Sequence, residues 1–144
     1  EMFEAVGERF WPGYFQMLRD RLRSGGRAGL QIITVEDEHF DAYRRAPDFI
    51  QRYIFPGGML PSPSRVGALA GEVGLMATHE AGFGGDYART LAEWRDRFRS
   101  AWPRLAPSGF DDRFRRMWEF YLHYCEAGFR AGAIDVKHFV FARP

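Results

Sequence analysis

A helix, a glycine stop and a short apolar strand follow one another early in the chain, and this order strongly constrains the fold. Apolar residues recur at i, i+4 and i+8 over residues 10–22, which predicts an amphipathic helix. Ser24-Gly25-Gly26 ends this helix, because glycine readily adopts the left-handed conformation. The segment AGLQIITV, residues 28–35, is short and rich in β-branched residues, so we expect a strand buried on both faces. Together these segments predict half of a parallel α/β unit.

The remaining chain alternates helical and strand patterns. A short helical insertion is expected over residues 36–52, and further helices over 65–73, 87–105 and 111–132. Ser62 is placed to cap the first of these helices, and Gly74 to end it. The segments LMATHEAGF and IDVKHFVFA, residues 75–83 and 134–142, are expected to be strands.

Composition fits one globular domain and excludes several functional classes. The 144 residues are 46% hydrophobic and 17% aromatic, which is enough for a core. A net charge of +1 argues against a nucleic-acid partner. The lone Cys125 cannot form an internal disulfide and suits a reducing compartment. No run approaches the roughly 20 apolar residues of a membrane span, and none resembles a signal peptide, so we expect a cytoplasmic protein.

The chain begins at Glu1 instead of methionine, and its apolar pattern starts at once with Met2, Phe3 and Val6. This start leads us to expect that an upstream part belongs to the protein. The four histidines are scattered without metal-ligand spacing, and we therefore expect no metal site.

Two glycine-rich turns and an arginine-rich helix face are open to more than one interpretation. Gly25-Gly26 precedes a strand, which favours a helix stop, and GFGGDYART opens a helix but lacks the Walker lysine and the dinucleotide spacing. Arg95, Arg97 and Arg99 are most simply the solvated side of a helix. The functional alternative is attraction to anionic lipid headgroups.

Three polar residues occur in apolar surroundings: Glu4, Gln31 and Tyr121. Each alone is more often structural, but together they could line one pocket. The segment IQRYIFPGGMLPS, residues 50–62, is also unusual, because an apolar run enters a turn-rich Pro-Gly-Gly sequence.

Four separated segments carry a family resemblance: EMFEAVG, FIQRYIFPGGMLPS, FGGDYARTLAEWRDRF and FYLHYCEAGFRAGAIDV. In this order they resemble the C-terminal half of cyclopropane-fatty-acid synthases and the related S-adenosylmethionine-dependent lipid and mycolic-acid methyltransferases. The resemblance covers essentially all 144 residues.

The resemblance implies a Rossmann-like methyltransferase sheet with strand order 3-2-1-4-5-7-6. Residues 1–144 would supply strands 5, 6 and 7 with their helices, as the substrate-side portion of the domain. The glycine loop and acidic residue that bind S-adenosylmethionine in the family would lie upstream of Glu1. We therefore expect an incomplete sheet, no complete cofactor site, and no methyl transfer by this chain alone.

The implied reaction passes a methyl group from S-adenosylmethionine to the double bond of an unsaturated phospholipid acyl chain, with a carbocation intermediate and bicarbonate as base. By resemblance, Glu4 and Tyr121 hold the bicarbonate, and Ile33 contributes through its backbone. The family's histidine is replaced by Gln31, which can donate a hydrogen bond but cannot carry charge, so a cyclopropane product does not follow.

The resemblance also implies partners. Residues 50–62 would follow strand 5 on the acyl-chain side, which makes Tyr53, Ile54 and Phe55 candidates for the wall of a lipid pocket, although a packing loop is an alternative. Without strand 4, residues 29–35 form an apolar edge that should pair with a second copy or with the N-terminal half. Peripheral contact with the inner membrane face is expected. The alternative function is a non-catalytic lipid-binding or interaction module.

Overall fold

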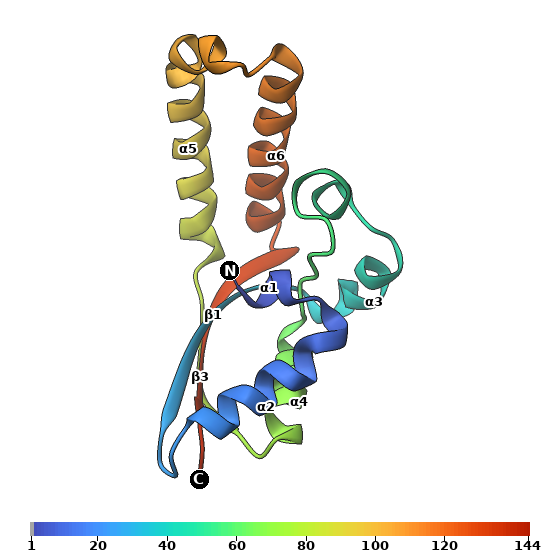
Figure 1. Ribbon diagram of the computed structural model, residues 1–144, viewed down its shortest axis with the longest axis vertical. Helices are drawn as coiled ribbons and strands as arrows, with labels where there is room; N and C mark the ends of the chain where they lie inside the picture. Colours follow the sequence, from blue (N-terminus) through green and yellow to red (C-terminus); the bar gives the residue numbers. More distant parts are fainter. Residues whose placement is uncertain (1) are drawn as a thin grey trace. The chain divides into compact units, whose positions relative to one another are not determined.

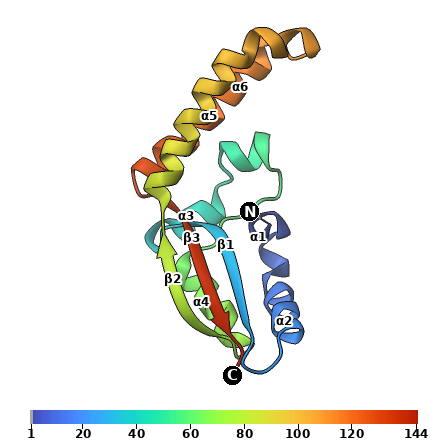
Figure 2. The ribbon, with the colours of Figure 1, turned by 90° about the vertical axis from the view of Figure 1, so that its left-hand side faces the viewer.

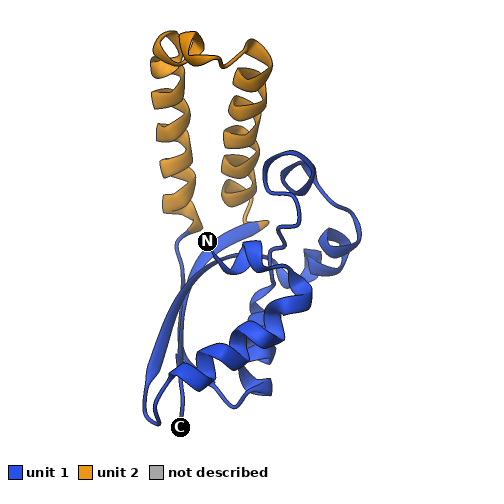
Figure 3. Ribbon diagram, in the orientation of Figure 1, with its two compact units in different colours: residues 1–83, 134–144 blue, residues 84–133 orange. Residues whose placement is uncertain are grey.

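The computed structural model describes residues 2–144, which divide into two compact units (Figure 3). The first unit comprises the chain up to Phe83 together with residues 134–144. The second unit, residues 84–133, is inserted between the last two strands of the first. The single domain expected from chain length therefore contains two units.

A three-stranded sheet organises the first unit (Figures 1 and 2). Strands β1 (Arg27–Val35) and β2 (Met76–Gly82) both pair antiparallel with β3 (Ile134–Ala142), in the order β1-β3-β2. Consequently β1 and β2 run parallel to each other, and their carboxyl ends lie at the same end of the sheet. This order confirms the expected arrangement of strands 5, 7 and 6 in an incomplete, open α/β sheet.

The expectation that β1 is buried on both faces is wrong for most of its length. Ile32 and Thr34 are 0% exposed, whereas Gly29 and Gln31 point to the opposite face and are exposed. The two faces become equally buried only at the carboxyl end, where Val35 is 4% exposed. The difference arises because α2 (Trp11–Arg21) and α4 (Pro63–Glu72) both cover the face that carries Ile32 (Figure 2).

Aromatic and aliphatic side chains from both helices and the sheet form the core of the first unit. Its members are Phe3, Trp11, Phe15, Ile32, Met59, Val66, Leu69, Ala70, Leu75, Phe139 and Phe141. The predicted helix signals are confirmed at both helices. The Ser62 hydroxyl accepts a hydrogen bond of 3.3 Å from the Arg65 N–H at the start of α4, and Gly25, at φ +74°, turns the chain after α2.

The predicted insertion over residues 36–52 is two short helices instead of one. Helix α3 (Asp37–Arg45) ends before Pro47, since proline disfavours helical geometry in the residue that precedes it. A single π-helical turn, η2 (Ile50–Ile54), follows. The Pro56-Gly57 turn comes next, with Gly57 at φ +85°.

The second unit is a helical hairpin of α5 (Gly84–Leu105) and α6 (Asp112–Arg130), joined by the 3-10 turn η3 (Ala106–Ser108) (Figure 3). The Asp111 carboxylate caps α6 by accepting a hydrogen bond of 2.7 Å from the Phe114 N–H. Leu91 on α5 and Leu122 and Phe129 on α6 are buried. Trp94 is 44% exposed on α5, whereas Leu91 and Trp102 of the same helix are buried. The apolar face of α5 is therefore wider than the part that α6 covers.

Candidate functional site

Glu4 is a buried carboxylate held from two directions. It lies on the short helix α1 (Phe3–Val6), beside the core residue Phe3, and is 9% exposed. Its Oε1 accepts a hydrogen bond of 2.6 Å from the Ile33 N–H on β1. Its own backbone carbonyl accepts a hydrogen bond of 2.9 Å from the Met59 N–H. The structure therefore brings Glu4 and Ile33 together, two of the residues expected at the site.

Tyr14 lies close enough to Glu4 for their electrostatic interaction to matter. Burial raises the pKa of the Tyr14 hydroxyl, and the negative charge of Glu4 raises it further. The Tyr14 ring packs against Phe3 with ring centroids 5.0 Å apart. Its hydroxyl therefore remains a neutral hydrogen-bond donor near a carboxylate. The sequence pattern indicated only a core position for Tyr14, since helical periodicity does not reveal what a hydroxyl faces.

Gln31 forms a cross-strand pair with His138. The two residues are register partners on β1 and β3, and the His138 Nε2 lies 3.1 Å from the Gln31 Oε1. Because an amide oxygen can only accept, Nε2 must carry the proton in this contact. This contact orients the amide, whose NH₂ group is its donor. Gln31 and Ile33 lie on the same face of β1, since they are two residues apart.

The outer edge of β1 is partly engaged within the chain. The N–H groups of Ile33 and Val35 donate to Glu4 and to the Pro61 carbonyl, the latter at 3.0 Å. The predicted unpaired edge over residues 29–35 is therefore occupied at its carboxyl end. A strand added there would have to use the half of β1 around Gly29.

The apolar segment after α3 is fixed to the Glu4 helix by its backbone. Gln51 Nε2 donates a hydrogen bond of 3.1 Å to the Gly58 carbonyl. The N–H of the next residue, Met59, donates to the backbone carbonyl of Glu4. Tyr53 and Phe55 are 62% and 55% exposed, and Ile54 is half-buried. The three candidate pocket residues thus lie on a short, tethered segment with two large apolar side chains exposed.

Tyr121 belongs to the second unit, on α6. It is half-buried, and its ring contacts Trp118 with centroids 5.0 Å apart. A second half-buried tyrosine, Tyr87, lies in the first turn of α5 and packs against Phe129 at 4.9 Å. Tyr87 follows the carboxyl end of β2 by five residues, in the position from which Rossmann-like folds supply ligand-binding side chains. The sequence analysis did not single it out, although DYART was among the quoted motifs.

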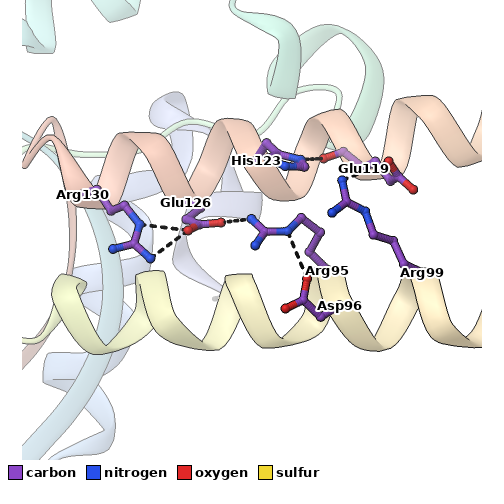
Figure 4. A network of polar contacts seen from close by, with 7 residues as sticks. All are labelled: Arg95, Asp96, Arg99, Glu119, His123, Glu126 and Arg130. Atoms are coloured by element: carbon purple, nitrogen blue, oxygen red, sulfur yellow. Dashed lines mark hydrogen bonds and ion pairs between the residues drawn. The ribbon is translucent and has the colours of Figure 1, made fainter.

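The predicted solvated face of Arg95, Arg97 and Arg99 does not exist as one face. Arg95 and Arg99 are four residues apart and both reach α6, where they pair with Glu126 and Glu119 (Figure 4). Arg97 lies on the other side of α5 and pairs with Glu93 at 3.0 Å. The helical period separates alternate residues in this way. Lipid headgroups therefore cannot use Arg95 without breaking an ion pair inside the hairpin.

The two glutamates of α6 are each held by two arginines. Glu126 also pairs with Arg130 at 2.8 Å, and Glu119 with Arg115 at 3.3 Å. Burial raises the pKa of the Glu126 carboxyl, but the Arg130 hydrogen bond and the charges of Arg95 and Arg130 outweigh it, so the pKa lies below its usual value. Burial also raises the pKa of the Glu119 carboxyl, but the hydrogen bonds and charges of Arg99 and Arg115 outweigh it, so this pKa too lies below its usual value.

Within residues 2–144, no group of three or more histidine, cysteine, aspartate or glutamate side chains is arranged to hold a metal ion. No helix in this part of the chain is long and apolar enough to cross a membrane.

Comparison with known proteins gives a consistent result. The family model for mycolic acid cyclopropane synthetase matches residues 1–139. Tuberculostearic acid methyltransferase UfaA1 of Mycobacterium tuberculosis is 45% identical over 144 residues, covering 99% of this chain and 34% of that protein. Cyclopropane-fatty-acyl-phospholipid synthase of Escherichia coli is 34% identical over 142 residues, covering 99% of this chain and 36% of that protein.

Solved structures agree with this assignment. The cyclopropane synthase MmaA2 of Mycobacterium tuberculosis superposes with a TM-score of 0.87 at 25% identity, covering 98% of this chain and 52% of that one. The mycolic acid cyclopropane synthase CmaA1 in complex with SAH and CTAB gives a TM-score of 0.85 at 26% identity, covering 96% and 52%. The chain spans about a third of the curated relatives and half of these structures. By sequence and fold together, this chain belongs to the mycolic acid cyclopropane synthetase family.

Proposed function

We propose that this chain forms the substrate-side portion of an S-adenosylmethionine-dependent methyltransferase that modifies the double bond of an unsaturated phospholipid acyl chain. The observation that carries the proposal is the buried carboxylate of Glu4, held by Ile33 and by the segment that presents Phe55. Keeping a carboxylate 9% exposed among aromatic side chains costs free energy, which points to a functional requirement. The names of the relatives supply the reaction class.

The S-adenosylmethionine site lies mostly outside this chain. Of the glycine-rich turns considered, Gly25 ends a helix before β1, and Gly84 and Gly85 open α5 directly after β2. The second turn joins a strand to a helix, but its sequence GFGGDYART lacks the dinucleotide spacing of such a cofactor loop. When bound elsewhere in the protein, the cofactor supplies an electrophilic methyl group. We therefore propose that residues 1–144 alone do not transfer methyl groups.

Bicarbonate fits the donor set of the candidate site. Glu4 offers an acceptor for the single bicarbonate O–H, while the Gln31 NH₂ group offers a donor to its negatively charged oxygens. Ile33 contributes through its backbone N–H, which holds the Glu4 carboxylate in place. Bound bicarbonate would supply a base for the proton lost after methyl transfer. Tyr121 is the proposed hydroxyl donor, and Tyr87 is the competing candidate.

A developing carbocation requires surroundings that exclude water and stabilise positive charge. Aromatic faces meet both requirements, since their quadrupoles attract cations. Tyr53, Ile54 and Phe55 are the proposed acyl-chain contacts, and the hydrogen bond from the Met59 N–H to the Glu4 carbonyl, a few residues further on, supports this proposal. Lipid-facing residues of this kind are expected to be exposed when no acyl chain covers them.

The protein is proposed to act in the cytoplasm at the inner membrane face, where phospholipid acyl chains are available. The half of β1 around Gly29 is proposed to pair with a second copy or with the preceding part of the protein. A non-catalytic lipid-binding module is the second candidate, favoured by the exposure of Tyr53 and Phe55.

Radiolabelled methyl transfer separates these functions. The chain is assayed alone and joined to the cofactor-binding segment of the E. coli relative, with labelled S-adenosylmethionine and dioleoyl phosphatidylglycerol. Only the joined protein should label the lipid. A joined protein that is folded, binds both the cofactor and lipid, and labels nothing would favour the module. Turnover by the 144-residue chain alone would contradict the proposed location of the cofactor site.

A further inference from the structure

The turn of the helical hairpin carries a distinctive set of exposed side chains. We define the hairpin tip as residues 103–116, at the end of the second unit opposite its chain connections (Figure 3). Phe110 is 42% exposed at this turn and contacts Phe114 with ring centroids 4.7 Å apart. Pro103 and Pro107 precede it in the chain and are also exposed. A rigid turn therefore presents an aromatic ring to solvent.

Three exposed arginines belong to the same hairpin tip: Arg104, Arg113 and Arg116. Within residues 2–144, no ion pair or hydrogen bond joins their guanidinium groups to a carboxylate. The two tip aspartates lie at the start of α6, where Asp111 caps the Phe114 N–H. With Arg115 included, the tip has four arginines and two aspartates. Its net charge is therefore +2, whereas the net charge of the whole chain is +1.

The hairpin does not need these arginines for its own stability. Its two helices are joined by the ion pairs Arg95–Glu126 and Arg99–Glu119, which use none of Arg104, Arg113 and Arg116 (Figure 4). Arg104, Arg113 and Arg116 thus form no ion pair within residues 2–144, and they share the tip with the exposed ring of Phe110. Arginine and aromatic side chains together are typical of surfaces that bind the headgroup layer of a membrane. Guanidinium groups bind phosphate, and aromatic rings settle at the level of the headgroups.

We propose that the hairpin tip binds the surface of bilayers that contain anionic phospholipid, with the arginines on headgroup phosphates and Phe110 at the acyl boundary. The inference deepens the proposed lipid function by naming a membrane-contact surface. It does not depend on methyl transfer, because binding at the tip involves none of the residues placed at the candidate site. A bilayer is favoured over nucleic acid, because the chain as a whole carries a net charge of only +1.

Vesicle co-sedimentation of the whole chain tests this surface. Vesicles of equimolar phosphatidylglycerol and phosphatidylcholine are compared with vesicles of phosphatidylcholine alone. We expect binding to the anionic vesicles only, weakened at high salt. Replacing Arg104, Arg113 and Arg116 together by glutamine should lower the partition coefficient on the order of 100-fold, since each basic residue contributes about fivefold near an anionic surface. Phe110→Ser should lower it about tenfold.

The matched control replaces Arg21, Arg23 and Arg27, three exposed arginines of the first unit, by glutamine. It removes the same charge from another place, and circular dichroism verifies that both triple variants are folded. Equal loss of binding in the two triple variants would overturn the proposal, because it would show an effect of net charge alone. Unchanged binding by the tip variant, or tip-dependent self-association without vesicle binding, would overturn it as well.

Failure here is distinguishable from failure of the proposed function. Loss of vesicle binding by the tip variant with normal labelling of detergent-dispersed phospholipid by the joined enzyme supports a membrane-contact role separate from catalysis. If the joined enzyme labels no lipid but the chain still binds anionic vesicles through the tip, the membrane inference stands and the methyltransferase proposal falls.

Discussion

The Ile33 N–H donates a hydrogen bond of 2.6 Å to the Glu4 carboxylate, across 29 residues of sequence. This contact joins the helix α1 to the carboxyl half of β1. It satisfies a backbone donor that would otherwise face the outer edge of the sheet, and it orients a buried acidic group. The structural and the proposed catalytic roles of Glu4 therefore meet in one side chain, and substitutions can separate them.

Replacing Glu4 by glutamine should preserve the fold and remove the function. The glutamine oxygen can still accept from Ile33, whereas Glu4→Ala leaves that N–H without an acceptor at a cost of about 1–3 kcal/mol. Urea unfolding should show the loss for alanine and little change for glutamine. In the joined enzyme, both variants should transfer methyl groups at least about 100-fold more slowly, as expected when the bicarbonate base loses the carboxylate that positions it. Normal transfer by Glu4→Gln would assign Glu4 a structural role alone.

Tyr14 should make stability fall at high pH. Its pKa in the folded chain is raised above the ordinary value of 10.0, so the unfolded chain loses this proton first as the pH rises. The free energy of unfolding should therefore be intact below pH 10 and decrease above it. Tyr14→Phe removes this contribution. Glu4→Gln should lower the Tyr14 pKa, measured by ultraviolet difference titration against Tyr14→Phe, because the neighbouring negative charge is gone. An unchanged titration would show that the two groups do not interact.

Glu126→Gln should destabilise the chain by about 3 kcal/mol at pH 7, since Arg130 loses its carboxylate and Arg95 loses its partner on α6 and keeps only Asp96 on its own helix. The pKa of Glu126 is depressed, so its contribution is present above the ordinary pKa of 4.5 and is lost as the pH falls through the folded value. Urea unfolding of the variant and the parent should converge at acidic pH. Arg97→Gln is the control, because its exposed pair is worth less than about 1 kcal/mol. Equal effects of the two substitutions would contradict the assignment.

Gln31→His should increase the affinity of the joined enzyme for bicarbonate. A histidine can carry positive charge beside an anion, whereas an amide offers only a neutral hydrogen bond. The measurement is the bicarbonate concentration that gives half-maximal methyl transfer, which should fall several-fold, with Gln31→Asn as the neutral comparison. If transfer does not depend on bicarbonate in any variant, the proposed anion site is wrong.

Phe55→Asp should abolish acyl-lipid binding and leave binding of S-adenosylmethionine by the joined enzyme intact. The side chain is 55% exposed, so stability should change little. Met76→Asp, at a residue that is 54% exposed on β2, serves as the matched control and should retain lipid binding. Lipid binding is measured with a fluorescent fatty acyl probe. Equal loss of lipid and cofactor binding would make the segment a packing element.

Local sequence patterns determined the elements of this protein closely. The spacing of apolar residues located α2, α5 and α6, a β-branched run located β1 and alternation located β3, because these periods reflect which face of an element is buried. Ser62 and Gly25 marked helix ends through hydrogen bonding and backbone freedom, both local properties. Glu4, as a carboxylate in an apolar segment, was recognisable as a candidate before its contacts were known.

Only the tertiary structure decided what those elements face. An apolar run cannot reveal how many layers cover a strand, so the exposed face of β1 at Gln31, and its pairing with His138, depended on where α2 and α4 pack. In the same way, Arg95 became an interhelical partner of Glu126 only when α5 and α6 came together. Sequence periodicity sets which residues share a face, and long-range packing chooses the neighbour that meets it.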